Sequence, residues 1–227
     1  MIDVIIPAFN EQNAIGHVLD DIPDKVVRRV IVCDNNSSDR TSEIAKSKGA
    51  VVVKEPRPGY GYACLKCMDY IEKSHLPPPE IVVFLDADYS DYPEQMHELI
   101  APIVKDGYDL VIGSRALGKR EKGSMTPQQL FGNWLATKLI KRIYGYHFTD
   151  LGPFRAIKYD KLLKMEMTDK TYGWTVEMQI KAAKMNLKCT EVPAHYKKRI
   201  GHSKVSGTVT GSIGAGWKIL YTIYKYR

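Results

Sequence analysis

Two aspartates separated by a single residue are the strongest chemical signal in this sequence. Asp86 and Asp88 follow the apolar run 81–85, and in an extended segment side chains two residues apart lie on the same side. Two carboxylates with open coordination positions suit Mg²⁺ or Mn²⁺ bound jointly with a diphosphate, with Ser90 as a candidate third ligand. The same residues also suit a turn and an N-cap before a helix near Pro93, so the pair alone leaves both interpretations open.

Other polar residues follow the ends of predicted strands. Glu11 comes after the first apolar run, Asp34 after the second and Arg115 after the fifth. Ligands of open sheets bind at the carboxyl ends of the strands, so these side chains are expected to converge on one edge. The Asp34 carboxylate is suited to accept a hydrogen bond from a base or a ribose hydroxyl, whereas Glu11 also fits the first turn of a helix.

Five near-continuous apolar runs, separated by helical segments, indicate the elements that position this site. They cover residues 2–7, 29–33, 50–53, 81–85 and 109–113. Such runs are typical of parallel strands buried on both faces, so the sequence predicts an α/β fold with a central, mostly parallel sheet and helices on both faces. A length of 227 residues favours a single domain. Helices are expected over 41–48 and from starting points near Glu11, Tyr60, Pro93, Pro127 and Trp174.

No glycine-rich phosphate motif follows the first predicted strand. The segment Pro7–Glu11 contains neither a Gly-x-Gly-x-x-Gly pattern nor a Walker-type loop. This composition disfavours a dinucleotide-binding fold. It also disfavours a nucleotidyltransferase, which would be expected to place a glycine-rich loop there.

The positive charge of the chain lies at its C-terminal end. Eight basic residues and one acid, Glu191, fall between 188 and 227, which accounts for the whole formal net charge of +7. A neutral body with a basic end favours an anionic partner at that end: a phosphate, an acidic lipid surface or a nucleic acid. A nucleic acid leaves Asp86 and Asp88 unexplained, so no nucleic-acid partner is expected.

The last segment, 211–227, combines apolar, aromatic and basic residues. It predicts an amphipathic helix that either lies at a bilayer surface or docks against the protein's own body or a second subunit. No apolar run reaches the roughly 20 residues needed to span a bilayer, and no signal sequence precedes the first strand. The expected location is cytoplasmic, with peripheral contact at the inner face of the membrane.

Six segments, taken in order, resemble glycosyltransferase family 2, a large family of inverting enzymes with the GT-A fold. The family is indicated by 7–11, 34–41 and 86–88, and the dolichyl- and polyprenyl-phosphate sugar synthase branch by 113–115, 149–156 and 199–204. The resemblance implies a GT-A domain over 1–227. It divides into a nucleotide-sugar-binding half at 1–115, an acceptor-binding half at 116–210 and the amphipathic helix at 211–227.

The resemblance also implies roles for individual residues. The donor, a UDP- or GDP-sugar, would be contacted by Pro7, Phe9, Glu11, Asp34, Asp86, Ala87, Arg199 and Lys204. The metal, Mg²⁺ or Mn²⁺, would be bound by Asp86, Asp88 and Ser90. On the acceptor side the implied catalytic residues are Asp150, Arg115 and Arg155, of which the two arginines match positions that contact phosphates.

Two kinds of acceptor fit these residues. A polyprenyl phosphate is already anionic and needs no strong general base, and Arg115 and Arg155 would grip it as bidentate partners. A sugar or other hydroxyl would need a base, for which Asp150 and Glu177 are the candidates. The set of cations around the expected acceptor site favours the lipid phosphate, and transfer of a sugar to a polyprenyl phosphate is the predicted reaction.

Overall fold

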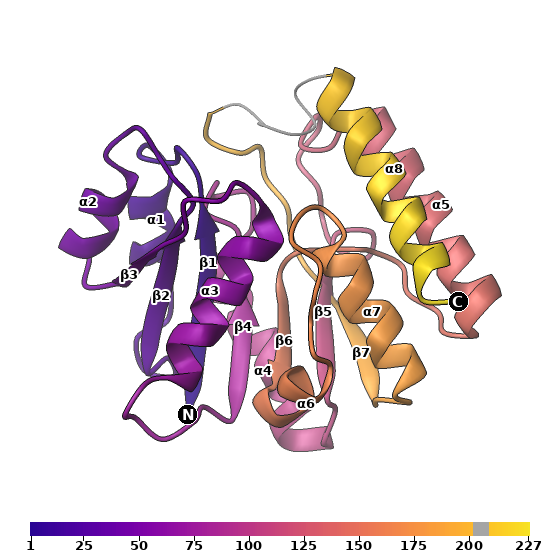
Figure 1. Ribbon diagram of the computed structural model, residues 1–227, viewed down its shortest axis with the longest axis horizontal. Coiled ribbons are helices and arrows are strands. Elements are labelled where there is room, and N and C mark those ends of the chain that lie inside the picture. Colours follow the sequence, from indigo (N-terminus) through magenta and orange to yellow (C-terminus); the bar gives the residue numbers. More distant parts are fainter. Residues whose placement is uncertain (202–208) are drawn as a thin grey trace.

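A seven-stranded sheet forms the centre of the protein (Figure 1). The computed structural model describes residues 1–201 and 209–227, with the backbone alone for residues 209, 210, 212 and 213. The strand order is β3-β2-β1-β4-β6-β5-β7. The bounds are β1 Ile2–Ala8, β2 Arg29–Asp34, β3 Val51–Lys54, β4 Ile81–Phe84, β5 Leu110–Ser114, β6 Arg155–Lys158 and β7 Cys189–Pro193. All five predicted strands are present, and β6 and β7 are additional.

Among the strands described, β6 alone runs against the others. It pairs antiparallel with both β4 and β5, whereas β5 and β7 are parallel. Its four residues include Arg155, and β7 is a partly polar strand at the edge of the sheet, so neither shows the apolar run of a buried strand. The predicted fold class, a mostly parallel sheet covered by helices, is confirmed.

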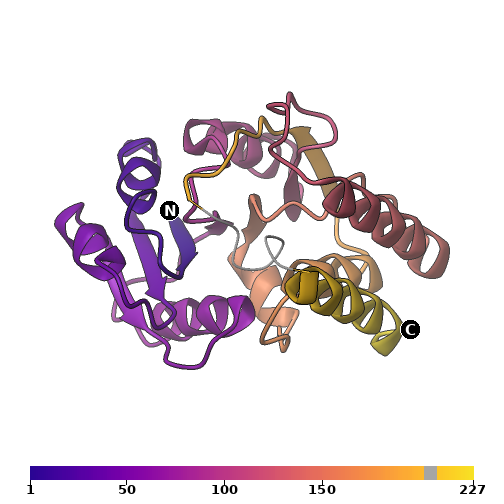
Figure 2. The same ribbon diagram turned by 90° about the horizontal axis from the view of Figure 1, so that it is seen from above.

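Helices cover both faces of the sheet (Figure 2). Successive strand residues point to opposite faces, so Ile5 packs in the core on the α3 side and Ile6 in the core on the α1 side. One face carries α1 (Ile15–Asp20), α2 (Thr41–Ser47) and α4 (Met96–Asp106), the last preceded by a short 3₁₀ turn at Pro93–Gln95. The other face carries α3 (Tyr60–Glu72), α5 (Pro127–Tyr144), α6 (Tyr159–Lys164), α7 (Trp174–Lys184) and α8 (Val209–Lys225).

Local sequence determines where α5 begins and ends. The Thr126 hydroxyl accepts a hydrogen bond from the backbone N–H of Gln129 (3.3 Å), and the Gln129 side chain accepts one from the backbone N–H of Thr126 (2.8 Å). This reciprocal cap, with Pro127 as the first helical residue, fixes the start of the helix. Gly145 ends it in a left-handed conformation with φ of 71°.

Helix α8 lies beside α5 at one end of the molecule (Figures 1 and 2). Its inner residues Thr222 and Ile223 are buried, and the Tyr144 hydroxyl of α5 donates to the Ile223 carbonyl. Lys218 of α8 also forms an ion pair with Asp169 (2.8 Å). The C-terminal helix is therefore docked on the body of the protein. None of the helices described here is long and apolar enough to cross a membrane.

A buried carboxylate ties α7 to the C-terminal end of the chain. Glu177, in the first turn of α7, accepts hydrogen bonds from the backbone N–H of Asp169 (2.6 Å) and from the hydroxyls of Thr168 (2.7 Å) and Tyr226 (2.6 Å). It also forms an ion pair with Lys181 (2.8 Å). Burial alone would raise the pKa of Glu177, but these hydrogen bonds outweigh it and lower the pKa to about 2.

We therefore predict that Glu177→Gln changes how stability depends on pH. The pKa in the folded state lies below the ordinary value of 4.5, so the carboxylate stabilises the fold above about pH 4.5 and loses this effect as the pH falls toward 2. The wild-type free energy of unfolding should fall by about 3 kcal/mol more than that of the variant across this window. Urea unfolding at a series of pH values measures the difference, and parallel curves for the two proteins would contradict the prediction.

Candidate active site

The carboxyl ends of β1, β2 and β4 bring the predicted donor residues to one edge of the sheet. The three strands are parallel neighbours, so the residues that follow them lie at the same end. Glu11, Asp34 and Asp88 are all buried there, although carboxylates are rarely buried without a functional or structural partner. Of the other predicted donor residues, Pro7 is part of β1, Phe9 is exposed and Ala87 is buried.

The residues after β2 organise two loops at this edge. The Asp34 carboxylate accepts a hydrogen bond from the backbone N–H of Ser37 (2.8 Å). The Asn35 side chain donates to the Arg57 carbonyl (2.7 Å) and accepts from the backbone N–H of Gly59 (2.8 Å). The loop that leads into α3 is thereby tied to the end of β2.

Asp86 and Asp88 lie together after β4. Oδ1 of Asp88 accepts hydrogen bonds from the backbone N–H (3.0 Å) and the hydroxyl of Ser90. Oδ1 of Asp86 is enclosed, and it has no hydrogen-bond partner among the described residues. Burial and the neighbouring charge of Asp88 raise the pKa of Asp86 to about 7. A divalent cation between the two carboxylates would remove this repulsion.

The backbone between Asp88 and Ser90 has an unusual conformation. Tyr89 has φ of 61°, a left-handed conformation that a bulky residue rarely adopts. Its hydroxyl donates to Asp21, and the Lys197 ammonium lies 3.2 Å from the centre of its ring. These contacts hold the tight turn in which Ser90 folds back onto Asp88.

The oxygen atoms at this edge suit a metal that shares its ligands with a diphosphate. In the parts of the chain described, no group of three or more His, Cys, Asp or Glu side chains is arranged to hold a metal ion. Asp86, Asp88 and Ser90 supply hard oxygen ligands and leave coordination positions for phosphate oxygens, an arrangement that Mg²⁺ and Mn²⁺ accept. The residues present therefore fit the predicted metal.

The segment 194–200 runs along residues 86–90, which we call the aspartate segment. The backbone N–H of Lys197 donates to the Ser90 carbonyl (2.9 Å), and that of Ile200 donates to the Asp88 carbonyl (3.0 Å). A part of the chain that is more than 100 residues away in sequence is thereby bonded directly to the predicted metal site.

This pairing places Arg199 between Glu11, a predicted ligand of the donor, and Asp88, a predicted ligand of the metal. Its Nη2 lies 2.9 Å from Oε1 of Glu11, and its Nη1 lies 3.2 Å from Oδ2 of Asp88. The guanidinium therefore puts positive charge where the sequence predicts a metal and a diphosphate. Lys204, the second predicted cation on the donor side, lies outside the described residues.

Arg115 and Asp150 form a bidentate ion pair on the acceptor side. Nε and Nη2 of Arg115 each lie 2.8 Å from a carboxylate oxygen of Asp150, and the Arg115 backbone N–H donates to the same carboxylate (2.8 Å). The guanidinium also faces the ring of Tyr196, 5.1 Å from its centre. Burial opposes the charge, but Asp150 raises the pKa of Arg115, so this cation persists at every accessible pH.

Side chains from three elements hold the loop 149–152 that carries Asp150. Glu191 of β7 accepts from the first two backbone N–H groups of the loop (2.8 and 3.1 Å). Asn133 of α5 bonds to the backbone on both sides of Asp150 (3.1 and 2.8 Å). Gln179 of α7 donates to the Asp150 carbonyl (2.9 Å). The position of the Asp150 carboxylate is thus set by the backbone beneath it.

Arg155 does not lie where a ligand of the acceptor phosphate was expected. Its side chain is completely buried and donates to the carbonyls of Gly152 (3.0 Å), Leu151 (3.1 Å) and Thr175 (3.0 Å). Burial lowers the pKa of Arg155 to about 10. In this arrangement the guanidinium ties the 149–152 loop to α7, and its predicted contact with a phosphate has no support.

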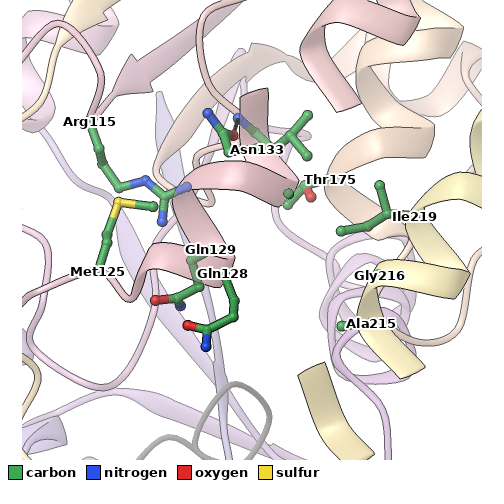
Figure 3. A pocket seen from close by; sticks show the side chains of 11 residues that line it. Arg115, Met125, Gln128, Gln129, Asn133, Thr175, Ala215, Gly216 and Ile219 are labelled. Atoms are coloured by element: carbon green, nitrogen blue, oxygen red, sulfur yellow. Dashed lines mark hydrogen bonds between the residues drawn. The ribbon is translucent and has the colours of Figure 1, made fainter. Parts of the chain in front are cut away.

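A cavity of about 200 Å³ opens beside Arg115, between α5 and α8 (Figure 3). Gln128 and Gln129 of α5 line it with amide groups, while Met125 and Ile219 contribute apolar surface. The combination of a cation, amides and apolar side chains suits a ligand with an anionic head and an apolar continuation.

The profile described as glycosyl transferase family 2 matches residues 3–165. The chain belongs to this family. It is a glycosyltransferase that uses a nucleotide-sugar donor, and the resemblance drawn from its six segments is confirmed.

Relatives of this glycosyltransferase include a dolichyl-phosphate hexose transferase and an undecaprenyl-phosphate mannosyltransferase. It is 34% identical over 216 residues to the dolichyl-phosphate hexose transferase of Haloferax volcanii, covering 92% of this chain and 88% of that protein. It is 28% identical over 220 residues to the undecaprenyl-phosphate mannosyltransferase of Micrococcus luteus, covering 91% and 88%.

The fold of this glycosyltransferase is also that of a known structure. The glucosyl-3-phosphoglycerate synthase of Mycobacterium tuberculosis, crystallised with Mn²⁺, UDP-glucose and phosphoglyceric acid, matches with a TM-score of 0.77 at 22% identity. The match covers 100% of this chain and 79% of the other. It confirms the GT-A fold.

Three residues of the glycosyltransferase site were missed in the sequence. Tyr196, which stacks on Arg115, belongs to a segment noted only for its charge. Asn133 is a polar residue within a helix, and Glu191 is the one acid between 188 and 227. The isolation of Glu191 among basic residues was a usable signal, whereas nothing in the sequence pairs Tyr196 or Asn133 with the acceptor side.

We predict that Arg199→Ala strengthens Mn²⁺ binding in the absence of nucleotide. The substitution removes a cation from Asp88, so the metal no longer competes with it, and the affinity for Mn²⁺ should rise about fivefold. Binding of a nucleoside diphosphate should weaken about tenfold, because one charged donor to phosphate is lost.

Mn²⁺ titration followed by electron paramagnetic resonance, with calorimetry for the nucleotide, measures both affinities. Arg57→Ala is the matched control, since Arg57 is paired with Glu55 rather than Asp88. Unchanged or weaker Mn²⁺ binding by a folded Arg199→Ala protein would contradict the competition.

Proposed function

We propose that this glycosyltransferase moves a sugar from a UDP- or GDP-sugar to a polyprenyl phosphate, with inversion at the anomeric carbon and with Mg²⁺ or Mn²⁺ as cofactor. The observation that carries the proposal is how Arg115, Asp150 and Glu177 are paired. Arg115 lines a cavity with a guanidinium that the ion pair with Asp150 keeps charged, and the carboxylates that would serve as a base for a hydroxyl acceptor, Asp150 and Glu177, are already engaged in hydrogen bonds.

Neither candidate base is suited to take a proton. Both carboxylate oxygens of Asp150 bond to Arg115, and the side chain is buried. Glu177 is fully enclosed and has a pKa of about 2, far below the operating range of a general base. A phosphate acceptor needs neither group, because its oxygen is already anionic at neutral pH.

Separate groups of residues in the chain then bind the donor and the acceptor. Glu11 and Asp34 hold the nucleoside, with Pro7, Phe9 and Ala87 as further contacts in the donor half, 1–115. Asp86, Asp88 and Ser90 would hold the metal, which would supply electrostatic stabilisation of the leaving diphosphate. Arg199 and Lys204 add fixed positive charge on the same side.

In the acceptor half, 116–210, Arg155 and Asp150 become positioning residues. Arg115 holds the lipid phosphate, and Asp150 keeps the guanidinium in place. One phosphate oxygen attacks the anomeric carbon as the bond from that carbon to the diphosphate breaks, and the diphosphate leaves with the electron pair. Attack from the face opposite the leaving group inverts the configuration. The lipid-phosphate relatives support this choice of acceptor.

Mass spectrometry of the reaction products tests the proposal directly. Purified protein with Mn²⁺, a polyprenyl phosphate and a panel of UDP- and GDP-sugars should yield a glycosylated lipid phosphate. Asp88→Ala should reduce the yield by at least about 100-fold, because the leaving diphosphate loses its metal. Transfer to a hydroxyl compound without any lipid product, in the same panel, would reject the acceptor proposed here.

Asp150→Asn separates a positioning role from a base. If Asp150 only orients Arg115, the amide still accepts one hydrogen bond, and kcat with the lipid phosphate should stay within about tenfold of wild type. The KM for the lipid phosphate should rise instead. A fall in kcat of about 1,000-fold with KM unchanged is the signature of a lost general base and would contradict the assignment.

A further inference from the structure

Two neighbouring helices carry large aromatic side chains that the fold leaves exposed. On α8, Trp217 is 72% exposed, and Tyr221 and Tyr224 are also exposed. On α5, Phe131 is 62% exposed and Trp134 is likewise exposed. The two helices run side by side at one end of the molecule (Figures 1 and 2).

The spacing of these aromatics places them on the outer face of each helix. Residues 217, 221 and 224, and likewise 131 and 134, are three or four positions apart, which sets each group in one stripe. The inner faces are already occupied, because Thr222 and Ile223 of α8 and Ile140 of α5 are buried. The docking of α8 on the body therefore does not use the aromatic stripe. Apolar side chains gathered on one outer surface indicate a partner.

The charges on the same two helices identify the partner as anionic. The stretches 127–144 and 209–227 contain no Asp or Glu, whereas each contains three basic residues. The three of α5 are Lys138, Lys141 and Arg142, all exposed. Of the three in 209–227, Lys225 and Arg227 are exposed, whereas Lys218 is paired with Asp169. Tryptophan and tyrosine beside lysine and arginine, without acids, are typical of surfaces that lie at the headgroup level of an anionic bilayer.

The cavity beside Arg115 connects this surface with the active site. Both helices contribute to its walls, with Gln128 on α5 and Ile219 on α8 (Figure 3). A lipid phosphate held at Arg115 would have its apolar chain directed between α5 and α8. Helix α5 therefore belongs to the membrane side of the molecule together with the C-terminal helix.

We propose that α5 and α8 together form one docking surface for an anionic bilayer, and that the cavity between them passes the lipid phosphate from the membrane to Arg115. The inference rests on the proposed lipid acceptor for its purpose, but the docking itself is measured without acceptor or donor. Both helices contribute to the surface, because exposed aromatic side chains lie on α5 as well as on α8.

Vesicle flotation with the full chain tests the surface. Wild-type protein should bind vesicles of phosphatidylcholine and phosphatidylglycerol about tenfold more than vesicles of phosphatidylcholine alone. The substitutions Phe131→Ser and Trp217→Ser, each made singly, should each lower binding to the anionic vesicles about tenfold. Val104→Ser is the matched control, because Val104 is an equally exposed apolar residue (69%) on α4, on the opposite face of the sheet.

Three results would overturn the docking surface. They are equal binding of wild type to both vesicle types, unchanged binding by the Phe131→Ser variant, and a wild-type dimer in sedimentation that Trp217→Ser dissociates. The last would make a second copy of the chain the occupant. Circular dichroism and Mn²⁺ binding, which should match wild type, show that the variants are folded.

Transfer in detergent micelles keeps this inference separate from the proposed function. A micelle presents the lipid phosphate without a bilayer, so both serine variants should retain most of their transfer activity there. Activity in micelles without selective vesicle binding would reject the docking surface and leave the acceptor intact. Selective vesicle binding without transfer by wild type would reject the acceptor and leave the surface.

Discussion

The ion pair between Arg115 and Asp150 is the interaction on which the proposed acceptor site depends. Both groups are largely buried, and removing one partner of a buried pair costs about 3–5 kcal/mol because the other charge is left uncompensated. The loop around Asp150 must therefore keep its position. Glu191, Asn133 and Gln179 bond its backbone from a strand and two helices. Strand β6 begins three residues after this loop, and its first residue, Arg155, donates to the loop carbonyls of Leu151 and Gly152.

The strands that carry the proposed donor site were predictable from the sequence because their signals are local. Apolar runs mark β1, β2 and β4, and the carboxylates Asp86 and Asp88 follow the last of them directly. Parallel strands then bring their ends together without further information. The acceptor half is different, since Arg115 and Asp150 are 35 residues apart and Glu191 is 41 residues beyond Asp150. Neither periodicity nor composition reports a contact at that separation. The strands β6 and β7 were missed for another reason: they are short and partly polar, and neither shows an apolar run.

Arg155 shows that residue type alone does not predict whether an arginine can contact a ligand. In the sequence it stands beside Arg115 as one of two arginines that a phosphate acceptor would require. In the structure one lines a cavity and the other is enclosed among backbone carbonyls. The difference lies in the environment that β6 creates: the strand starts at Arg155 and draws its side chain beneath the loop. Burial, rather than charge, decides which arginine can meet a ligand.

The backbone pairing of 194–200 with the aspartate segment has a thermodynamic consequence. Ile200, the last residue of that segment, bonds to the Asp88 carbonyl, and α8 begins nine positions later in the sequence, at Val209. The proposed donor site and the C-terminal helix are therefore neighbours along the chain. Any change that membrane contact makes in the free energy of donor binding must be matched by an equal change that the donor makes in membrane contact. A donor-loaded enzyme and an empty one would then be distributed differently between membrane and solution.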